Sequence, residues 1–258
     1  MQEIINKIGP YYLGAGGFGD FLVSLTTFYD KVDSANLIWF ADNKELIQTG
    51  SKLFSKLKTR LIFSKNSPEF YDKWFQILDN PNCLGTGVTP RELVYKEWER
   101  VNIFDKYGVI EFPEFVNEIV TIRANPSKQA GVMLSGNSSN GKNKIITEKT
   151  MEIIAAELED YDVFIFGNKK DIPSYTPPTW IQGTSEMNLH KQMQWIKGMD
   201  VFYSVDSWCK TWSAFNKIPT IVYDSVYDPG YLNAMNGYDW GHYVFLQPWS
   251  KIELREQS

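Results

Sequence analysis

The second half of the chain repeats one pattern: a short apolar segment, then a polar loop, then a stretch with helical periodicity. Uninterrupted apolar segments of this length are typical of parallel strands that are covered on both faces. The alternation therefore predicts a doubly wound parallel sheet, with ligands at the carboxyl ends of its strands. The expected strands are 131–134, 163–166, 201–203 and 220–223, and the expected helices are one that carries Met151, Ile154, Ala155 and Leu158 on one face, one over about 187–197 and one after Asp206.

The first half opens with a similar unit. A short strand over 11–13, a glycine loop over 14–20, a helix from Phe21 to about Tyr29 and a strand over 37–40 fit one βαβ unit. Residues 44–118 are less regular and include an amphipathic helix over 46–57. The polar stretch 123–129, which contains a proline, marks a seam. We therefore expect an α/β protein with two Rossmann-like lobes, 1–124 and 125–258, and a cleft between them.

Composition argues against several classes of protein. No apolar run approaches the ~20 residues of a membrane span, and the N-terminus lacks the pattern of a signal peptide. Cys83 and Cys209 have no metal or redox spacing, so a protein of the reducing cytoplasm is expected. With only His190 and His242, a Ser-His-Asp hydrolase or a multi-histidine zinc site is disfavoured. A net charge of −5 argues against a broad nucleic-acid footprint.

The glycine loop matches G-x-G-x-x-G at Gly14, Gly16 and Gly19, and Asp42 follows near the end of the second strand. This pattern is the fingerprint of a dinucleotide site, although it also fits a purely structural tight turn. Asp20 comes directly after the loop. A carboxylate there either complements the helix dipole or acts as a general base toward a hydroxyl group.

Two loops of the second half have the composition of a phosphate site. The loop 135–144 joins a strand to a helix, and its hydroxyls, amides and lysines suit a diphosphate, although it lacks the Walker spacing and alone also fits a solvated turn. The loop 205–211 opens a helix, which Asp206 or Ser207 can cap. The segment 160–162 imitates a D-x-D metal motif. Because this segment lies between an expected helix and an expected strand, we interpret it as solvated surface and expect no metal.

Taken together, the three loops resemble the heptosyltransferases (glycosyltransferase family 9, GT-B fold), which add heptose to lipopolysaccharide. Gly19-Asp20-Phe21-Leu22 is similar to the family's G-D-x-L segment, and Ser138 to Lys142 is similar to its donor-phosphate loop. Asp206-Ser207, Ala214 to Pro219 and 222–230 follow its D-[ST]-G…A…P…G-P-x-D-P-G pattern. The chain departs from the family at Trp208 and Asp224, which replace glycines, at Thr211, which replaces a histidine, and over 44–118.

The resemblance implies an inverting, metal-independent glycosyltransferase that uses a nucleotide-diphosphate sugar and no cofactor. Asp20 would be the catalytic base, within an acceptor and phosphate loop formed by Gly16, Gly17, Phe18 and Gly19. The acceptor would be a saccharide or a lipid-linked saccharide. The donor-binding residues would be Ser138, Ser139, Lys142, Asp206, Ser207, Trp208 and Lys210.

Three alternatives stay open at this stage. A phage-type DNA glycosyltransferase that acts on a hydroxymethylated base would use the lysines and arginines between Lys52 and Lys65. An NAD(P)-dependent oxidoreductase would use the glycine loop and Asp42. A non-catalytic sugar-nucleotide binding module would follow if Trp208 and Thr211 had damaged the active site. The sequence leaves the sugar, the base and the oligomeric state open, and Asp171 is the candidate for the residue that contacts the ribose.

Overall fold

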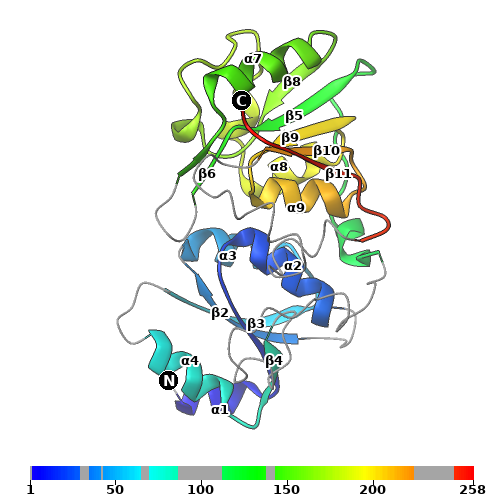
Figure 1. Cartoon of the computed structure of the whole chain (residues 1–258). Helices are drawn as coiled ribbons and strands as arrows, with labels where there is room; N and C mark the ends of the chain where they lie inside the picture. Colours follow the sequence, from blue (N-terminus) through cyan, green and yellow to red (C-terminus); the bar gives the residue numbers. More distant parts are fainter. Residues whose placement is uncertain are drawn as a thin grey trace. The chain divides into compact units, whose positions relative to one another are not determined.

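The chain forms two compact α/β units, each built around a parallel sheet (Figure 1). One unit comprises residues 1–101 and 113–118, and the other comprises 102–112 and 119–258. The structure is a computed structural model, and it describes residues 2–29, 35–41, 43–64, 70–86, 112–137, 143–223 and 247–258.

The first unit contains a four-stranded parallel sheet with the order β3-β2-β1-β4. Since β2 and β3 lie on one side of β1 and β4 lies on the other, the winding direction reverses between β1 and β4. The loop after β1 is therefore at a topological switch point, where ligands of such sheets bind. Its elements are α1 (Gln2–Ile8), β1 (Tyr11–Ala15), α2 (Phe18–Phe28), β2 (Ala35–Ala41), α3 (Lys44–Ser51), β3 (Leu57–Ser64), α4 (Phe70–Leu78), β4 (Cys83–Thr86) and the 3-10 helix η1 (Glu114–Glu118).

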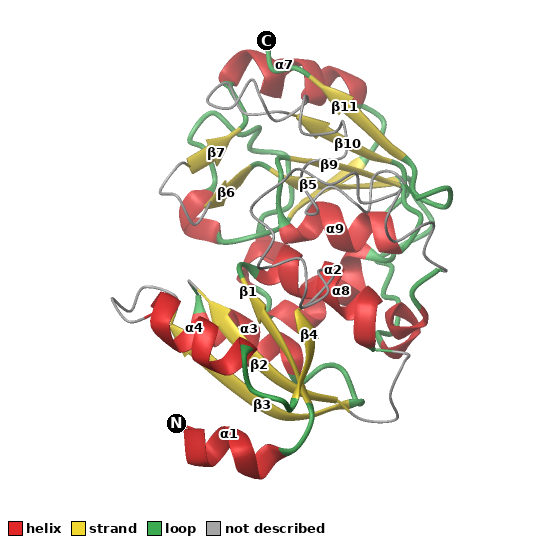
Figure 2. Cartoon of the chain, turned by 60° about the horizontal axis from the view of Figure 1, so that its bottom comes forward, coloured by secondary structure: helices red, strands yellow, loops and turns green. Residues whose placement is uncertain are grey.

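Aromatic side chains fill much of the core of this unit. Helices α2 and α3 cover one face of its sheet and α1 and α4 cover the other (Figure 2). On the α2 side, the Phe21 ring lies edge-on to Trp39 and tilted against Phe54, with ring centroids 5.5 and 6.1 Å apart. The segment η1 joins this core because Phe115 packs edge-on against Phe54. The Glu118 carboxylate also accepts hydrogen bonds from the Tyr29 hydroxyl and the Ser55 amide.

Gly14 is required by the packing of this core. A Cβ atom at position 14 would lie 2.0 Å from Cζ3 of Trp39, which is fully buried. We expect Gly14→Ala to lower the free energy of unfolding by about 1–3 kcal/mol, because the indole ring must move within a close-packed core. Urea denaturation measures this loss. Gly183→Ala is the control, because a Cβ there meets nothing within 4 Å; equal stability of the two variants would contradict the packing role of Gly14.

The second unit contains a five-stranded parallel sheet with the order β11-β10-β9-β5-β8. Its winding direction reverses between β5 and β9, which places a second switch point at the carboxyl ends of these two strands. Its elements are β5 (Gln129–Met133), β6 (Ser135–Asn137), β7 (Asn143–Ile145), α7 (Glu148–Glu157), β8 (Asp162–Ile165), η2 (Lys169–Asp171), η3 (Gly183–Glu186), α8 (Leu189–Ile196), β9 (Val201–Ser204), α9 (Trp208–Phe215), β10 (Thr220–Tyr223) and β11 (Ile252–Arg255).

The sheet of the second unit is covered on both faces, as its apolar strands predict. Helix α7 lies on one face and helices α8 and α9 lie on the other (Figure 1). Every residue of β5 is buried, and so is every residue of α9 from 209 to 215. The last strand, β11, is fastened by Arg255, whose guanidinium pairs with Glu157 at the end of α7 at 2.7 Å. The Tyr203 hydroxyl of β9 donates to the same carboxylate.

The predicted α/β class and the predicted parallel strands are confirmed, whereas two helix boundaries are wrong. Helix α2 begins at Phe18 rather than Phe21, because Asp20 lies in its first turn and caps it. The helix expected over 46–57 ends at Ser51, and Leu57 already begins β3. Gly50, in the last turn of this helix, leaves room for the Phe18 ring, since a Cβ there would lie 2.1 Å from it.

Among the described helices, none has the length and apolar character needed to cross a bilayer.

Candidate functional site

The switch point of the second unit is lined by two loops. After β5, the chain turns into the antiparallel hairpin of β6 and β7, and after β9 it continues through Val205, Asp206 and Ser207 into α9. The hairpin packs on the start of α9. A Cβ on Gly136 would lie 3.3 Å from the Asp206 carbonyl oxygen. Two of the three loops that sequence analysis selected are therefore in contact.

An ion cluster joins these two loops. The Lys210 ammonium donates to one carboxylate oxygen of Asp206, Oδ1, at 2.5 Å, and the Lys144 ammonium pairs with the other, Oδ2. The side chains of Lys144 and Asp206 are 20% and 25% exposed, while that of Lys210 is 2% exposed. With two ammonium groups and one carboxylate, these three side chains together carry a net charge of about +1.

Helix α9 begins inside this cluster. Ser207 is its N-cap: the hydroxyl accepts from the Lys210 amide and lies 2.9 Å from the Ser204 hydroxyl. Trp208, its first residue, is partly exposed, whereas Thr211 is buried and its hydroxyl donates to the Ser207 carbonyl. The positive end of the helix dipole thus adds to the net charge of the ion cluster.

The Cys209 thiol is not available as a nucleophile at this end of the sheet. It is fully buried and lies 3.5 Å from the sulfur of Met133. Burial raises the pKa of the Cys209 thiol well above its usual value, so the thiol stays protonated.

The structure adds Lys144 to the residues expected from sequence. Ser138, Ser139 and Lys142 lie outside the described residues, and so does Asp42. Lys144 belongs to the same loop, but its partner Asp206 is 62 positions further along the chain. No spacing rule connects residues so far apart along the chain. The sequence offered only the expectation that both loops follow strands of the same parallel sheet.

Asp171, the candidate for the ribose contact, lies in η2, which follows the carboxyl end of β8. Because β8 pairs with β5, η2 follows the same end of the sheet as the ion cluster.

In the first unit, the glycine loop leads into the capped start of α2. Asp20 is the third residue of α2, and its Oδ2 accepts a hydrogen bond from the Gly17 amide at 2.7 Å. Gly16 has φ +126°, and a Cβ there would lie 2.2 Å from the same carboxylate oxygen. Phe18 is buried, and Gly19 and Asp20 are partly exposed. The loop thus fixes a partly exposed carboxylate at the switch point of this sheet.

The hydrogen bonds of the glycine loop disfavour a dinucleotide site. Such a site needs loop amides that point at a pyrophosphate. Here the Gly16 amide donates to the Phe40 carbonyl at 2.9 Å, and the Gly17 amide donates to Asp20. The Trp39 indole N–H also donates to the Gly16 carbonyl at 3.1 Å. Packing and capping therefore account for Gly14 and Gly16.

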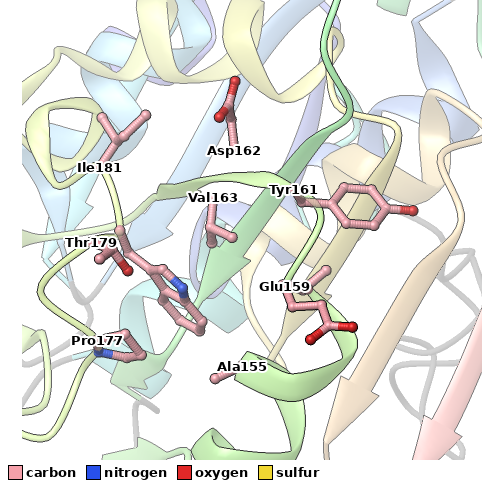
Figure 3. A pocket seen from close by; sticks show the side chains of 10 residues that line it. Ala155, Glu159, Tyr161, Asp162, Val163, Pro177, Thr179 and Ile181 are labelled. Carbon is pink, nitrogen blue, oxygen red and sulfur yellow. The ribbon is translucent and has the colours of Figure 1, made fainter.

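A cavity of about 430 Å³ lies elsewhere in the second unit, at the amino end of β8. Figure 3 shows Glu159 and Tyr161 on one side of it and Pro177 and Thr179 on the other. It is at the opposite end of β8 from η2. Asp162, at its edge, accepts hydrogen bonds from Ser127 and Asn125, and these hold the pKa of its carboxyl below its usual value.

No group of three or more histidine, cysteine, aspartate or glutamate side chains is placed to hold a metal ion within the ranges that the structure describes. Asp162 of the D-x-D segment is the first residue of β8, and Asp160 is exposed between α7 and that strand.

Solved structures that share this fold include three glycosyltransferases. A family 9 glycosyl transferase from Veillonella parvula DSM 2008 has a TM-score of 0.56 and 9% identity, covering 96% of this chain and 86% of that one. The E. coli heptosyltransferase WaaC with ADP has a TM-score of 0.54 and 11% identity, covering 95% and 93%. E. coli ADP-heptose lps heptosyltransferase II has a TM-score of 0.52 and 13% identity, covering 95% and 90%. No family model and no curated protein matches the sequence.

The fold is therefore GT-B-like, with two Rossmann-like units, each with its own parallel sheet. Among proteins of this fold, the similarity is to heptosyltransferases of glycosyltransferase family 9.

Proposed function

We propose that the chain is a glycosyltransferase that takes its sugar from a nucleotide-diphosphate donor bound by the second unit. The observation that carries this proposal is the cluster of Lys144, Asp206 and Lys210 at the switch point of the sheet. It combines a net positive charge with a helix N-terminus, and both features stabilise phosphate oxygens. The similar heptosyltransferase WaaC was solved with ADP, the diphosphate part of such a donor.

The proposed reaction is a single inverting displacement. The acceptor hydroxyl attacks the anomeric carbon, the bond from that carbon to the donor phosphate breaks, and the hydroxyl proton passes to Asp20. Lys144 and the start of α9 stabilise the charge that develops on the departing diphosphate, which makes the transfer independent of a metal ion. Ser138, Ser139 and Lys142 take part on the strength of the resemblance. The acceptor is a saccharide or a lipid-linked saccharide.

The contacts of the basic residues in 52–65 do not favour DNA as the acceptor. Arg60 donates to the carbonyl groups of Ser51, Phe54 and Lys58. The Lys56 ammonium lies 5.4 Å from the centre of the Tyr29 ring. These cations stabilise the first unit itself, and a phosphate backbone would have to compete with those contacts.

Thermal unfolding with a panel of ligands tests the proposal. We expect one nucleotide-diphosphate sugar, and the matching nucleoside diphosphate, to raise Tm without magnesium. A ligand at 100 times its Kd stabilises the folded state by about 2.7 kcal/mol, which is a shift of a few degrees. NAD(P)H serves as the control ligand. Stabilisation by NAD(P)H alone would refute the proposal in favour of an oxidoreductase.

Product formation separates the enzyme from a silent binding module. Incubation of the stabilising donor with a panel of saccharide and lipid-linked saccharide acceptors is expected to release nucleoside diphosphate in step with a glycosylated product. Donor binding without turnover on any acceptor of the panel would instead favour the binding module.

A further inference from the structure

Lys210 occupies a position where a lysine is unfavourable. It is the third residue of α9, and its side chain is 2% exposed in a helix whose residues 209–215 are all buried. Transfer of an ammonium group from water to such a site costs free energy. The first turn is also the positive end of the helix dipole, which repels a cation. An apolar side chain would satisfy the packing alone, so the charge itself calls for an explanation.

The partner of Lys210 supplies that explanation. Its ammonium donates to Asp206 at 2.5 Å, and the second oxygen of the same carboxylate holds Lys144 of the hairpin. Asp206 therefore links a buried cation to a partly exposed one. With Lys144 alone, Asp206 would form a neutral pair. With both lysines, the three side chains together carry one positive charge in excess.

We infer that Lys210 is a positioning residue of the diphosphate site: its buried ammonium neutralises Asp206, so that this carboxylate holds Lys144 at the switch point without cancelling the attraction for a diphosphate. The inference rests on the proposed function. Lys210 is too enclosed to be a main ligand contact, and it acts through Asp206. Without Lys210, Asp206 would cancel the charge of Lys144 and so weaken the attraction for phosphate oxygens.

Lys210→Met is the decisive single variant, because methionine fills a similar volume without the charge. We expect its affinity for nucleoside diphosphates, measured calorimetrically with ADP, UDP, GDP, CDP and dTDP, to fall on the order of tenfold or more. Affinity for the corresponding nucleosides is expected to stay unchanged, since these ligands carry no phosphate.

The double variant Asp206→Asn with Lys210→Met tests how the effect is transmitted. Asparagine keeps an oxygen that accepts from Lys144, and the loss of the charges of Asp206 and Lys210 leaves the positive charge of Lys144. We therefore expect the double variant to recover most of the diphosphate affinity that Lys210→Met loses. Lys197→Met is the matched control, because this half-buried lysine donates to the Ile119 carbonyl and takes no part in the ion cluster.

Three results would overturn the inference: unchanged diphosphate affinity in Lys210→Met, an equal loss for nucleosides, or a double variant as weak as the single one. If Lys210→Met does not fold, the affinity of the double variant is the test. The double variant is expected to fold, because it replaces both partners of the ion pair by neutral side chains and leaves neither charge without its partner. Near-native affinity then supports the inference, and a large loss contradicts it. Failure of the native chain to bind any nucleoside diphosphate would instead overturn the proposed function.

Discussion

Asp20→Asn is expected to slow sugar transfer by about 10²–10⁴-fold, because that is the usual contribution of a positioned general base. The donor site in the second unit is not touched, so the affinity for nucleoside diphosphates should stay unchanged. Asparagine is the informative substitution, since its carbonyl oxygen replaces the carboxylate oxygen that accepts from the Gly17 amide. The first turn of α2 then keeps its cap, and only the basicity is lost. Initial-rate kinetics with saturating donor measures the effect.

Two comparisons separate the loss of a base from a general effect on the helix. Asp20→Ala removes both the base and the cap, so it should be as slow as Asp20→Asn and also less stable by about 1 kcal/mol. Glu45→Gln removes an exposed acid from the first turn of α3 and should leave transfer unchanged. Turnover of Asp20→Asn at the native rate would show that another group accepts the proton.

Sequence reasoning predicted the strands whose residues are continuously apolar, because such strands are buried on both faces. Residues 163–165 of β8 and 221–223 of β10 are uninterrupted apolar runs, and the structure buries all of them. Strand β11 was missed because its sequence, Ile252-Glu253-Leu254-Arg255, alternates polar with apolar residues and is only partly buried at the edge of the sheet. The hairpin of β6 and β7 was missed because its polar residues have the composition of a loop.

The spacing of the glycines in the glycine loop predicts that another group closely approaches the backbone there. It does not predict whether that group belongs to a ligand or to the protein. In the structure the neighbours are the Trp39 ring at Gly14 and the Asp20 carboxylate at Gly16. Both belong to the protein itself. A pattern of small residues therefore located the turn correctly, while the chemistry of the turn depended on residues that the pattern does not include.

The ion cluster was predictable only in part, for a similar reason. Asp206 and Lys210 are one helical turn apart, so their pairing follows from local spacing. The partner from the hairpin depends on the strand order, which brings the loops after β5 and β9 together. A single sequence therefore predicts which loops lie at the site, but not which residue of one loop contacts the other loop.

Lys144→Met is expected to reduce turnover by about 10²–10³-fold, which is the usual effect of removing one group that stabilises transition-state charge. Methionine keeps the length of the side chain but leaves Asp206 paired with Lys210 alone, so the cluster becomes neutral. Because the diphosphate gains negative charge as the glycosidic bond breaks, the transition state should lose more stabilisation than the bound donor. The rate constant with saturating donor should therefore fall more than the affinity for the donor.

Lys149→Met is the matched control, because Lys149 is exposed on α7, five positions after Lys144 and outside the ion cluster. It should bind donor and turn it over at the native rate. Lys144→Arg keeps the positive charge with a different shape and should recover part of the loss. Comparison of Lys144→Met with Lys144→Arg thus separates the effect of the charge from the effect of the side-chain shape. If Lys144→Met retained native turnover while Lys210→Met lost diphosphate affinity, Lys142, the other lysine of the loop 135–144, would be the next candidate for the cation that faces the leaving group.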